Sequence, residues 1–217
     1  MSPFLAIDTS VGTSVALVAG GKVLAEVNID DRMGHAENIG LALAEVFKRA
    51  DVAPSRISAV VTGRGPAPFT GLRVGIGAAI AFAEGVARPI FGVVSHDAIA
   101  LAELSDAEAD STPLLVTTDA RRSEVYWSLY SGLDHHGVPV RIDGPHVNKP
   151  ADLDGLLAER GLKPRLATAE ISAANLAKVA ELQMLAGGAS DDVSALYLRA
   201  PDAVAPKDVS RTGKAVS

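Results

Sequence analysis

Apolar residues in the first half of the chain recur with two different periods, and each period predicts its own kind of element. Short apolar runs at residues 4–8, 14–18 and 23–30 predict three strands, with Gly20-Gly21 as the hairpin turn between the last two. Over residues 35–50 the apolar positions return every three or four residues, which predicts a helix with one apolar face. A strand at 59–62, an apolar helix at 72–87, a strand at 90–94 and a helix beginning near Ser95 follow.

The order of elements begins again after an acidic segment at residues 105–112, which we expect to be a linker. Strands are predicted at 114–119, 125–130 and 138–142, helices at 153–160 and 173–185, and a short strand around Leu166. In each half the first buried strand ends in an aspartate, Asp8 or Asp119, and then turns into the next strand, which indicates a structural duplication. We therefore predict an α/β protein of two lobes, 1–104 and 113–199, followed by a disordered polar tail at 200–217.

The segment from Gly63 to Gly75 is rich in glycine and proline and lies between a predicted strand and the apolar helix. Glycine permits backbone conformations that are closed to other residues, and proline fixes the loop while removing a hydrogen-bond donor. Such a loop before a helix is either an anion-binding turn or a rigid structural turn, and the residue pattern leaves both open. It is not a phosphate-binding P-loop, because no Gly-Lys-Ser/Thr sequence follows it.

The same segment resembles the signature of the TsaB (YeaZ) family of bacterial tRNA-modification proteins. The match is carried by Gly63-Arg64-Gly65-Pro66, Phe69-Thr70-Gly71-Leu72-Arg73-Val74-Gly75, Leu5-Ala6-Ile7-Asp8-Thr9, Asp119-Ala120-Arg121, Glu124-Val125-Tyr126-Trp127 and Tyr197-Leu198-Arg199. The resemblance extends over the first 130 residues and is weak between 142 and 195, where the chain is short for the family. Ala67-Pro68 stands where family members usually have Gly-Ser, which predicts a stiffer loop.

The resemblance implies the two-lobed actin-like / sugar kinase / Hsp70 (ASKHA) fold, with a duplicated three-stranded meander followed by helix–strand alternation. It also implies a non-catalytic scaffold subunit of the complex that adds the threonylcarbamoyl group to the adenosine beside the anticodon of tRNAs reading codons that begin with A. The implied partners are TsaD, which the protein binds and activates, and TsaE, which it recruits. A dimer without TsaD, and contact with tRNA only through the complex, are expected as well. No cofactor and no catalytic residue is expected in this chain.

The superfamily binds ATP between its lobes, in glycine-containing turns that let the backbone approach the phosphates. The first turn, with Asp8, Thr9 and Gly12, keeps a glycine, whereas the second, which begins at Asp119, has none. Gly187-Gly188, the candidate for the adenosine side, follows a predicted helix rather than opening one. Asp8, Thr9, Gly12 and Asp119 are therefore interpreted as a vestigial nucleotide site.

The helix that begins at Gly71 is apolar on nearly all sides, although one apolar face is enough to cover a sheet. Its second face is either more core or a contact with a partner, and small residues at a spacing of four permit a close approach. We predict that this helix and the helix at 35–50 form a docking surface for a protein partner. Its residues are His35, Ile39, Leu43, Gly71, Leu72, Gly75, Ile76, Ala79 and Ile80.

The composition narrows the function further. A net charge of −6 and the absence of a long lysine or arginine run argue against tight binding of nucleic acid by the chain alone. With no cysteine, disulfides and thiolate chemistry are excluded, and His35 and the His135-His136 pair lack the spacing of a metal site. The start of the sequence shows no signal-peptide pattern, and the helix at 72–87 contains Arg73 and Glu84 and is too short to span a bilayer. We expect a cytoplasmic protein that does not associate with membranes.

Two classes of enzyme remain as alternatives. The first is an ATP-dependent kinase or transferase of the same superfamily, against which the glycine-free turn at Asp119 and the short second lobe argue. The second is a protease, against which the absence of cysteine and of a Ser/His/Asp grouping or a His-Glu-x-x-His motif argues. Measurable ATP affinity of the isolated chain would favour the first.

Overall fold

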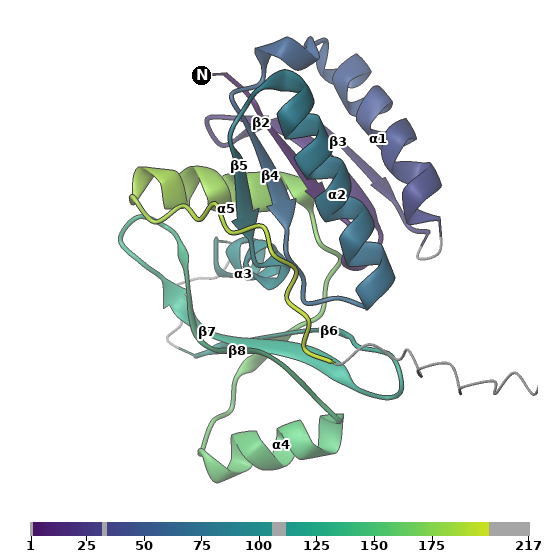
Figure 1. Ribbon diagram of the computed structural model, residues 1–217. Coiled ribbons are helices and arrows are strands. Elements are labelled where there is room, and N and C mark those ends of the chain that lie inside the picture. The colour runs from purple at the N-terminus through teal and green to yellow at the C-terminus, as the bar shows by residue number, and fades with distance from the viewer. Residues whose placement is uncertain (1, 32–33, 106–111, 200–217) are drawn as a thin grey trace, which may run out of the picture.

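Two β-sheets, one from each half of the chain, organise the computed structural model, which describes residues 2–31, 34–105 and 112–199 (Figure 1). The first sheet has the strand order β3-β2-β1-β4-β5, and the second has the order β8-β7-β6-β9. The strands are β1 (Phe4–Asp8), β2 (Thr13–Ala19), β3 (Lys22–Ile29), β4 (Ala59–Gly63), β5 (Ile90–Val93), β6 (Leu114–Asp119), β7 (Val125–Leu133), β8 (Pro139–Asn148) and β9 (Arg165–Ala167). The helices are α1 (His35–Ala50), α2 (Phe69–Val86), α3 (Ser95–Ser105), α4 (Pro150–Glu159) and α5 (Ala173–Leu185), with a 3-10 turn η1 (Pro54–Arg56).

The central strands of the first sheet are apolar throughout because helices cover both of its faces. In β1, Leu5 and Ile7 belong to a core shared with α1 and α2. Phe4 and Ala6, which alternate with them, belong to a second core shared with α3 and α5. The β1–β2–β3 meander is antiparallel, whereas β4 and β5 extend the sheet from β1 in parallel, with α1 and α2 as the crossover helices.

Helices α3 and α5 lie between the two sheets (Figure 1). Ile99 of α3 and Leu176 of α5 share one core with Val116 of β6 and Tyr130 of β7, so a single apolar layer joins the lobes. Helix α5 was expected within the second lobe, but it packs chiefly against β1 and β2 of the first sheet. The other face of the second sheet is covered by α4, around the buried ring of Trp127.

Helix α2 is longer than predicted, because it begins at Phe69 and spans 18 residues. By length and composition it is the one described helix that could cross a membrane, so the expectation that it is too short is wrong. Five of its residues are buried within the lobe, which makes it a core helix with one further, exposed face. The expected absence of membrane association stays a prediction.

The duplication inferred from the sequence is present in the structure. Both halves contain an antiparallel meander, β1–β2–β3 and β6–β7–β8, and in each the first strand also pairs in parallel with a later strand, β4 or β9. The division into lobes at 1–104 and 113–199 stays a prediction. Most of the expected linker and the whole expected tail fall on residues 106–111 and 200–217, outside the described residues.

Candidate functional site

A cleft of about 750 Å³ opens between the lobes, where the turns that follow β1 and β6 face each other. The start of α2 and the segment after β9 complete its walls. The two aspartate-ended turns that the sequence singled out therefore open on one cavity. Its polar lining residues include Thr9, Ser10, Thr70, Asp119, Arg121 and Glu170.

Asp8 lies beneath this cleft, is buried, and does not line it. Its Oδ1 accepts a hydrogen bond from Ser10 N at 2.7 Å, and its Oδ2 accepts one from Ser95 Oγ at 2.5 Å and one from Ser10 Oγ at 3.3 Å. Ser95 Oγ also accepts from Gly65 N at 3.1 Å. Burial raises the pKa of Asp8, and the hydrogen bonds from the two serines oppose that rise. The carboxyl group thus joins β1, the glycine-rich loop and the start of α3.

Thr9 holds the start of α2 against the first turn. Its Oγ1 donates to the carbonyl oxygen of Gly71 at 2.8 Å, and Gly75 lies one helical turn further along. A Cβ at Gly75 would overlap the Thr9 side chain, so this glycine is required for close packing inside the lobe. At Gly12 a Cβ would come within 2.9 Å of the Ile29 carbonyl oxygen, which is also an intramolecular constraint.

The turn after β6 has no glycine, yet three successive residues adopt conformations that glycine favours. Arg121, Arg122 and Ser123 have φ angles of 60°, 55° and 59°. Each costs on the order of 1 kcal/mol or more for a residue with a side chain. Asp119 Oδ1 supports the turn by accepting from Arg121 N at 2.8 Å. The turn therefore keeps its tight backbone conformation without a glycine, and two exposed arginines lie at its tip.

A buried polar network on α3 lies under the cleft and connects the first lobe to the second sheet. His96 Nδ1 lies 2.9 Å from Ser128 Oγ and its Nε2 lies 2.9 Å from Thr118 Oγ1. Burial, with a contribution from the charge of Arg141, lowers the pKa of His96 to about 3, so the ring is neutral. These ring contacts fix the position of the lobes by hydrogen bonds as well as by apolar packing.

Asp97, the next residue along α3, also connects this helix to the second sheet, through its carboxyl group. Its Oδ1 accepts from Tyr130 OH at 2.6 Å and from Arg141 Nε at 3.2 Å. Burial raises the pKa of Asp97, and the Arg141 guanidinium opposes that rise. The sequence analysis did not identify His96 and Asp97 as a pair. Two adjacent ionisable residues at the start of a largely apolar helix could have indicated it.

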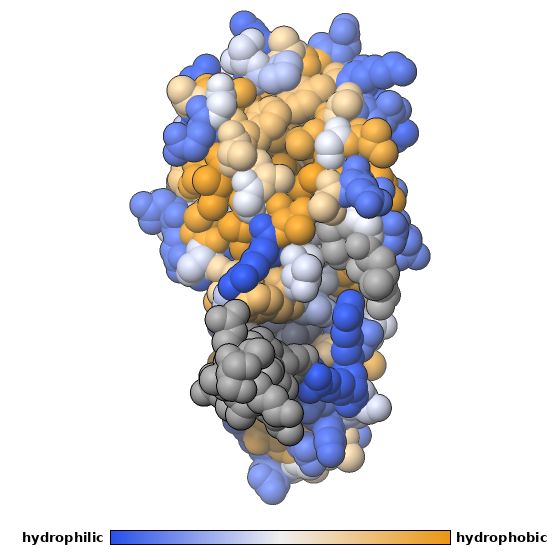
Figure 2. All heavy atoms as spheres, turned by 45° about the vertical axis from the view of Figure 1, so that its right-hand side comes forward, coloured by the Kyte–Doolittle hydropathy of each residue, from blue (hydrophilic) through white to orange (hydrophobic). Residues whose placement is uncertain are grey.

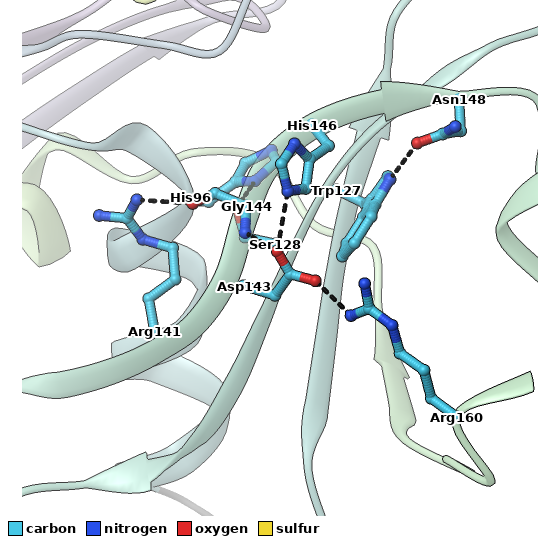
Figure 3. A network of polar contacts seen from close by, with 9 residues as sticks. All are labelled: His96, Trp127, Ser128, Arg141, Asp143, Gly144, His146, Asn148 and Arg160. Carbon is cyan, nitrogen blue, oxygen red and sulfur yellow. Dashed lines mark hydrogen bonds and ion pairs between the residues drawn. The ribbon is translucent and has the colours of Figure 1, made fainter. Parts of the chain in front are cut away.

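A second hollow, of about 410 Å³, lies on the α4 side of the second sheet and was missed altogether. Figure 3 shows Asp143 between His146 and Arg160. Asp143 Oδ1 is 2.8 Å from His146 Nε2, and its Oδ2 accepts from Arg160 Nη1 at 2.5 Å. The His146 ring packs against Trp127, with centroids 4.9 Å apart. Arg160 comes from the end of α4 and not from the strand, so no local sequence pattern marks this group.

The predicted partner residues divide into a buried set and a small exposed set. The structure buries Ile39, Leu72, Gly75, Ile76 and Ala79 inside the first lobe, so the expectation that they form an exposed seam is wrong. Ile39 of α1 and Ala79 of α2 belong to the core that covers the sheet, and Gly75 packs on Thr9. Leu72 and Ile76 pack instead against Ala67 of the glycine-rich loop and Ala195 of the final segment. Leu43 and Gly71 are partly buried, and Ile80 is 39% exposed. The side chain of His35 is not among those that the structure describes.

Part of the surface that α1 and α2 expose is apolar and rich in small residues, and charged residues such as Glu37 and Glu84 are exposed on the same helices. Phe47 and Phe82 stack with centroids 5.5 Å apart, which holds the two helices side by side. Figure 2 shows hydrophobic residues gathered over this part of the first lobe. We define the α1–α2 face by its exposed residues Gly40, Leu41, Ala44, Gly77, Ile80 and Ala81. Leu41 is 67% exposed, and a Cβ at Gly40 or Gly77 would meet nothing within 4 Å.

No group of three or more potential metal ligands occurs among residues 2–31, 34–105 and 112–199. Gly187 follows the end of α5 with a φ of 73°, and its N donates to the Met184 carbonyl oxygen at 3.1 Å. This is the position of a helix C-terminal glycine and not of a phosphate-binding turn. The cleft therefore has hydroxyl and arginine groups, but its predicted adenosine-side element lies elsewhere.

Two duplicated meanders, helices sandwiched between them and a cleft at their junction define a two-lobed α/β protein of the actin-like / sugar kinase / Hsp70 (ASKHA) class. Residues 22–215 match the family model described as TsaD, tRNA N6-adenosine threonylcarbamoyltransferase. The chain belongs to the TsaB (YeaZ) family, which shares this model with TsaD. The expectation drawn from the sequence signature is confirmed.

Individual relatives agree. An uncharacterized protein of Mycobacterium tuberculosis is 34% identical over 212 residues, which are 94% of both chains. The Escherichia coli tRNA threonylcarbamoyladenosine biosynthesis protein TsaB is 35% identical over 135 residues, which are 62% of this chain and 57% of that protein. The structure of YeaZ from Pseudomonas aeruginosa superimposes with a TM-score of 0.74 at 26% identity, covering 91% of this chain and 100% of that one. The match thus spans little more than half of the relative that carries the TsaB name.

Proposed function

We propose that this protein is a non-catalytic scaffold subunit in threonylcarbamoyladenosine biosynthesis on tRNA. In this role it binds and activates the transferase TsaD and recruits TsaE, and it forms a dimer of its own chain when TsaD is absent. The observation that carries the proposal is the α1–α2 face, an exposed apolar surface that the lobe does not need for its own packing. Relatives that are 33–35% identical to part of the chain are named for this pathway. Because the proposed role serves tRNA modification, we propose that the protein is cytoplasmic.

The α1–α2 face favours a helical partner that approaches closely. Glycine in the exposed interior of a helix costs about 1 kcal/mol relative to alanine. At Gly75 the Thr9 side chain accounts for that cost, but at Gly40 and Gly77 no described residue lies within 4 Å of an added Cβ to account for it. A partner helix that packs against the backbone at these positions accounts for it, and Leu41 and Ile80 supply apolar area around the small residues.

The geometry of the cleft supports a non-catalytic role. A kinase or transferase of this fold needs an accessible carboxylate beside the phosphates to hold a metal ion or orient a water molecule. Asp8 is buried and its oxygens accept hydrogen bonds from Ser10 and Ser95. Releasing it for a ligand would leave the Ser95 hydroxyl and the Ser10 N–H to find new partners. Asp119 does line the cleft, but its turn has no glycine amides to approach a phosphate, so the ATP-dependent alternative is disfavoured.

The protease alternative has one geometric candidate, the His96–Ser128 pair, whose Nδ1 and Oγ lie 2.9 Å apart. One of the similar P. aeruginosa structures is described as having similarity to peptidase YEAZ. Both residues of the pair are fully buried, so no peptide can reach the hydroxyl. The other ring nitrogen faces Thr118 and not a carboxylate, so the ring lacks the group that stabilises an imidazolium in a catalytic triad.

The scaffold proposal is tested by charge substitution on the α1–α2 face. Leu41→Arg and Ile80→Arg would each place an unpaired charge in a desolvated contact, which costs about 3 kcal/mol or more and weakens TsaD binding over a hundredfold. Leu185→Arg on α5 is the matched control, because Leu185 is 75% exposed and lies away from this face. Binding is measured by co-purification with TsaD and by sedimentation, alongside a melting curve for each variant.

Loss of TsaD binding by the two face variants, with unchanged melting curves and normal binding by Leu185→Arg, supports the proposal. Equal binding by all three variants shows that TsaD docks elsewhere. If the face variants bind TsaD normally but no longer form the dimer, the face serves self-association alone.

A further inference from the structure

The mouth of the cleft carries a stack of aromatic rings and an arginine that the scaffold role does not use. Phe69, the first residue of α2, lies against Tyr197 with ring centroids 4.7 Å apart. The Arg73 guanidinium lies over the Phe69 ring, 3.6 Å from its centroid, and Arg73 Nε donates to Tyr197 OH at 2.8 Å. Tyr197 is 41% exposed and Arg73 is exposed, so the stack faces solvent. Two rings thus hold a guanidinium in one orientation at the surface.

The left-handed turn after β6 stands across a small hollow from this stack. The hollow holds about 160 Å³ and is lined by Phe69 and Tyr197 on one side and by Arg121 and Arg122 on the other. The turn is held by Ala120 N, which donates to the Glu124 carbonyl oxygen at 3.0 Å. Its backbone conformation is therefore well supported although it is costly, and it keeps both exposed arginines beside the aromatic stack.

The residues around this hollow include several arginines, although the whole chain carries a net charge of −6. Of the acidic groups here, Glu124 pairs with Arg199 and Asp192 pairs with Arg64, the latter with an N–O distance of 2.6 Å. Asp119 is exposed and accepts a hydrogen bond from Arg121 N. Among the described residues, the basic ones that line the hollow are arginines. Arginine binds phosphate through two parallel hydrogen bonds and stacks on planar groups, and lysine does neither.

We propose that the protein has a contact surface for single-stranded RNA, which we call the arginine rim. It consists of Phe69, Arg73, Arg121, Arg122 and Tyr197. Exposed aromatic rings and guanidinium planes stack on unpaired bases, and neighbouring arginines bind the backbone phosphates. A base-paired helix presents no free base face to such a stack, so a loop or an unpaired end fits and a duplex does not. The proposal rests on the proposed function, which supplies a tRNA as the molecule that approaches the cleft.

The phosphate contacts are tested with the double variant Arg121→Gln, Arg122→Gln. The matched control is Arg56→Gln, Arg88→Gln, which removes two exposed arginines elsewhere on the first lobe. The probe is a fluorescently labelled tRNA anticodon stem-loop, titrated with the isolated chain and with its TsaD complex at several salt concentrations. The rim variant should weaken binding severalfold and reduce the slope of log K against log salt by about 0.7 for each lost contact. A slope equal to that of wild type and of the control overturns the proposal.

The stacking contact is tested at Tyr197. Tyr197→Ala should weaken binding of the same probe about tenfold, whereas Tyr197→Phe, which keeps the ring and loses only the hydroxyl, should change it less than about twofold. Equal loss in both variants overturns stacking as the mode of contact. A fully paired RNA hairpin stem that binds as tightly as the stem-loop also overturns it, as does full competition by an acidic peptide, which carries charge but no bases.

The outcomes separate this inference from the scaffold proposal. If TsaD does not bind the chain but the isolated chain shows the expected effects of the rim variants, the rim stands and the scaffold role falls. If TsaD binds and the rim variants leave RNA binding by the complex unchanged, the scaffold role stands and the rim proposal falls.

Discussion

Ser95 Oγ, on the first residue of α3, lies 2.5 Å from Asp8 Oδ2, at the end of β1. This hydrogen bond occupies a carboxylate that is buried and does not line the cleft. Because Ser95 also accepts from Gly65 N, the same contact fixes the glycine-rich loop. The position that resembles a nucleotide site thus serves as an internal brace.

Mg-ATP is therefore expected to bind this protein poorly. Binding would have to pull Asp8 out of its buried hydrogen bonds or rely on Asp119 and Glu170, and the turn after β6 offers arginine side chains instead of glycine amides. Calorimetric titration of the isolated chain should show no heat of binding at submillimolar nucleotide, and no phosphate should be released. A micromolar dissociation constant would contradict this reading of the cleft.

Gly75 and Gly77 should respond in opposite directions to the same substitution. Gly75→Ala places a methyl group against Thr9 and is expected to destabilise the protein by about 1–3 kcal/mol. Gly77→Ala adds a methyl group in open space on an exposed helix and should stabilise it by about 0.5–1 kcal/mol. Urea unfolding of the two variants measures both changes. A stabilising Gly75→Ala would show that the Thr9 turn can move aside.

The pair Ile76 and Ile80 separates the core of α2 from its exposed face. Ile76 is only 9% exposed and packs with Leu72 and Ala67, so Ile76→Arg buries an unpaired charge and should cost about 3 kcal/mol or more of folding free energy. Ile80→Arg, one turn further along, should change stability by less than about 0.5 kcal/mol. Thermal melting distinguishes them. An unchanged melting curve for Ile76→Arg would mean that this side chain reaches solvent.

Stability should decrease in mild acid because of His96. In the folded protein its pKa lies at about 3, whereas in the unfolded chain it lies near the ordinary 6.5. Between these values the unfolded state binds one more proton, so the free energy of unfolding falls by about 1.4 kcal/mol for each pH unit below about 6.5. The full loss approaches about 4–5 kcal/mol near pH 3.

Two buried carboxyls oppose this trend, because the raised pKa values of Asp8 and Asp97 favour the folded state as pH falls toward 3.8. The contribution of His96 is therefore the difference in the free energy of unfolding between wild type and His96→Asn. It is measured by urea unfolding between about pH 4.5 and 7, at steps of about half a pH unit. A plot of the free energy of unfolding against pH should be less steep for the variant than for wild type, by about 1.4 kcal/mol per pH unit. His135→Asn, on an exposed hairpin, is the control, and equal slopes in all three proteins would refute a buried neutral His96.

The sequence by itself determined the elements, the duplication and the family. Strands such as β1 and β6 are recognisable because both of their faces are buried. β1 is a continuous apolar run ended by Asp8, and β6 begins with Leu114, Leu115 and Val116 and ends in Asp119. Helix α1 is recognisable because one apolar face covers the sheet while the other meets solvent. These features depend on neighbours along the chain, so a local pattern is enough to find them.

Only the tertiary structure decided which face of α2 is core. An all-round apolar helix has no polar side to mark its orientation, so the sequence could not show that Leu72 and Ile76 point inward while Gly77 and Ile80 point outward. The same holds for groups assembled from distant segments. Ser95 meets Asp8 across 87 positions and Tyr197 meets Arg73 across 124, because the folding of α3 and of the final extended segment onto the first sheet brings them together. Contacts set by long-range packing leave no periodic trace in the sequence.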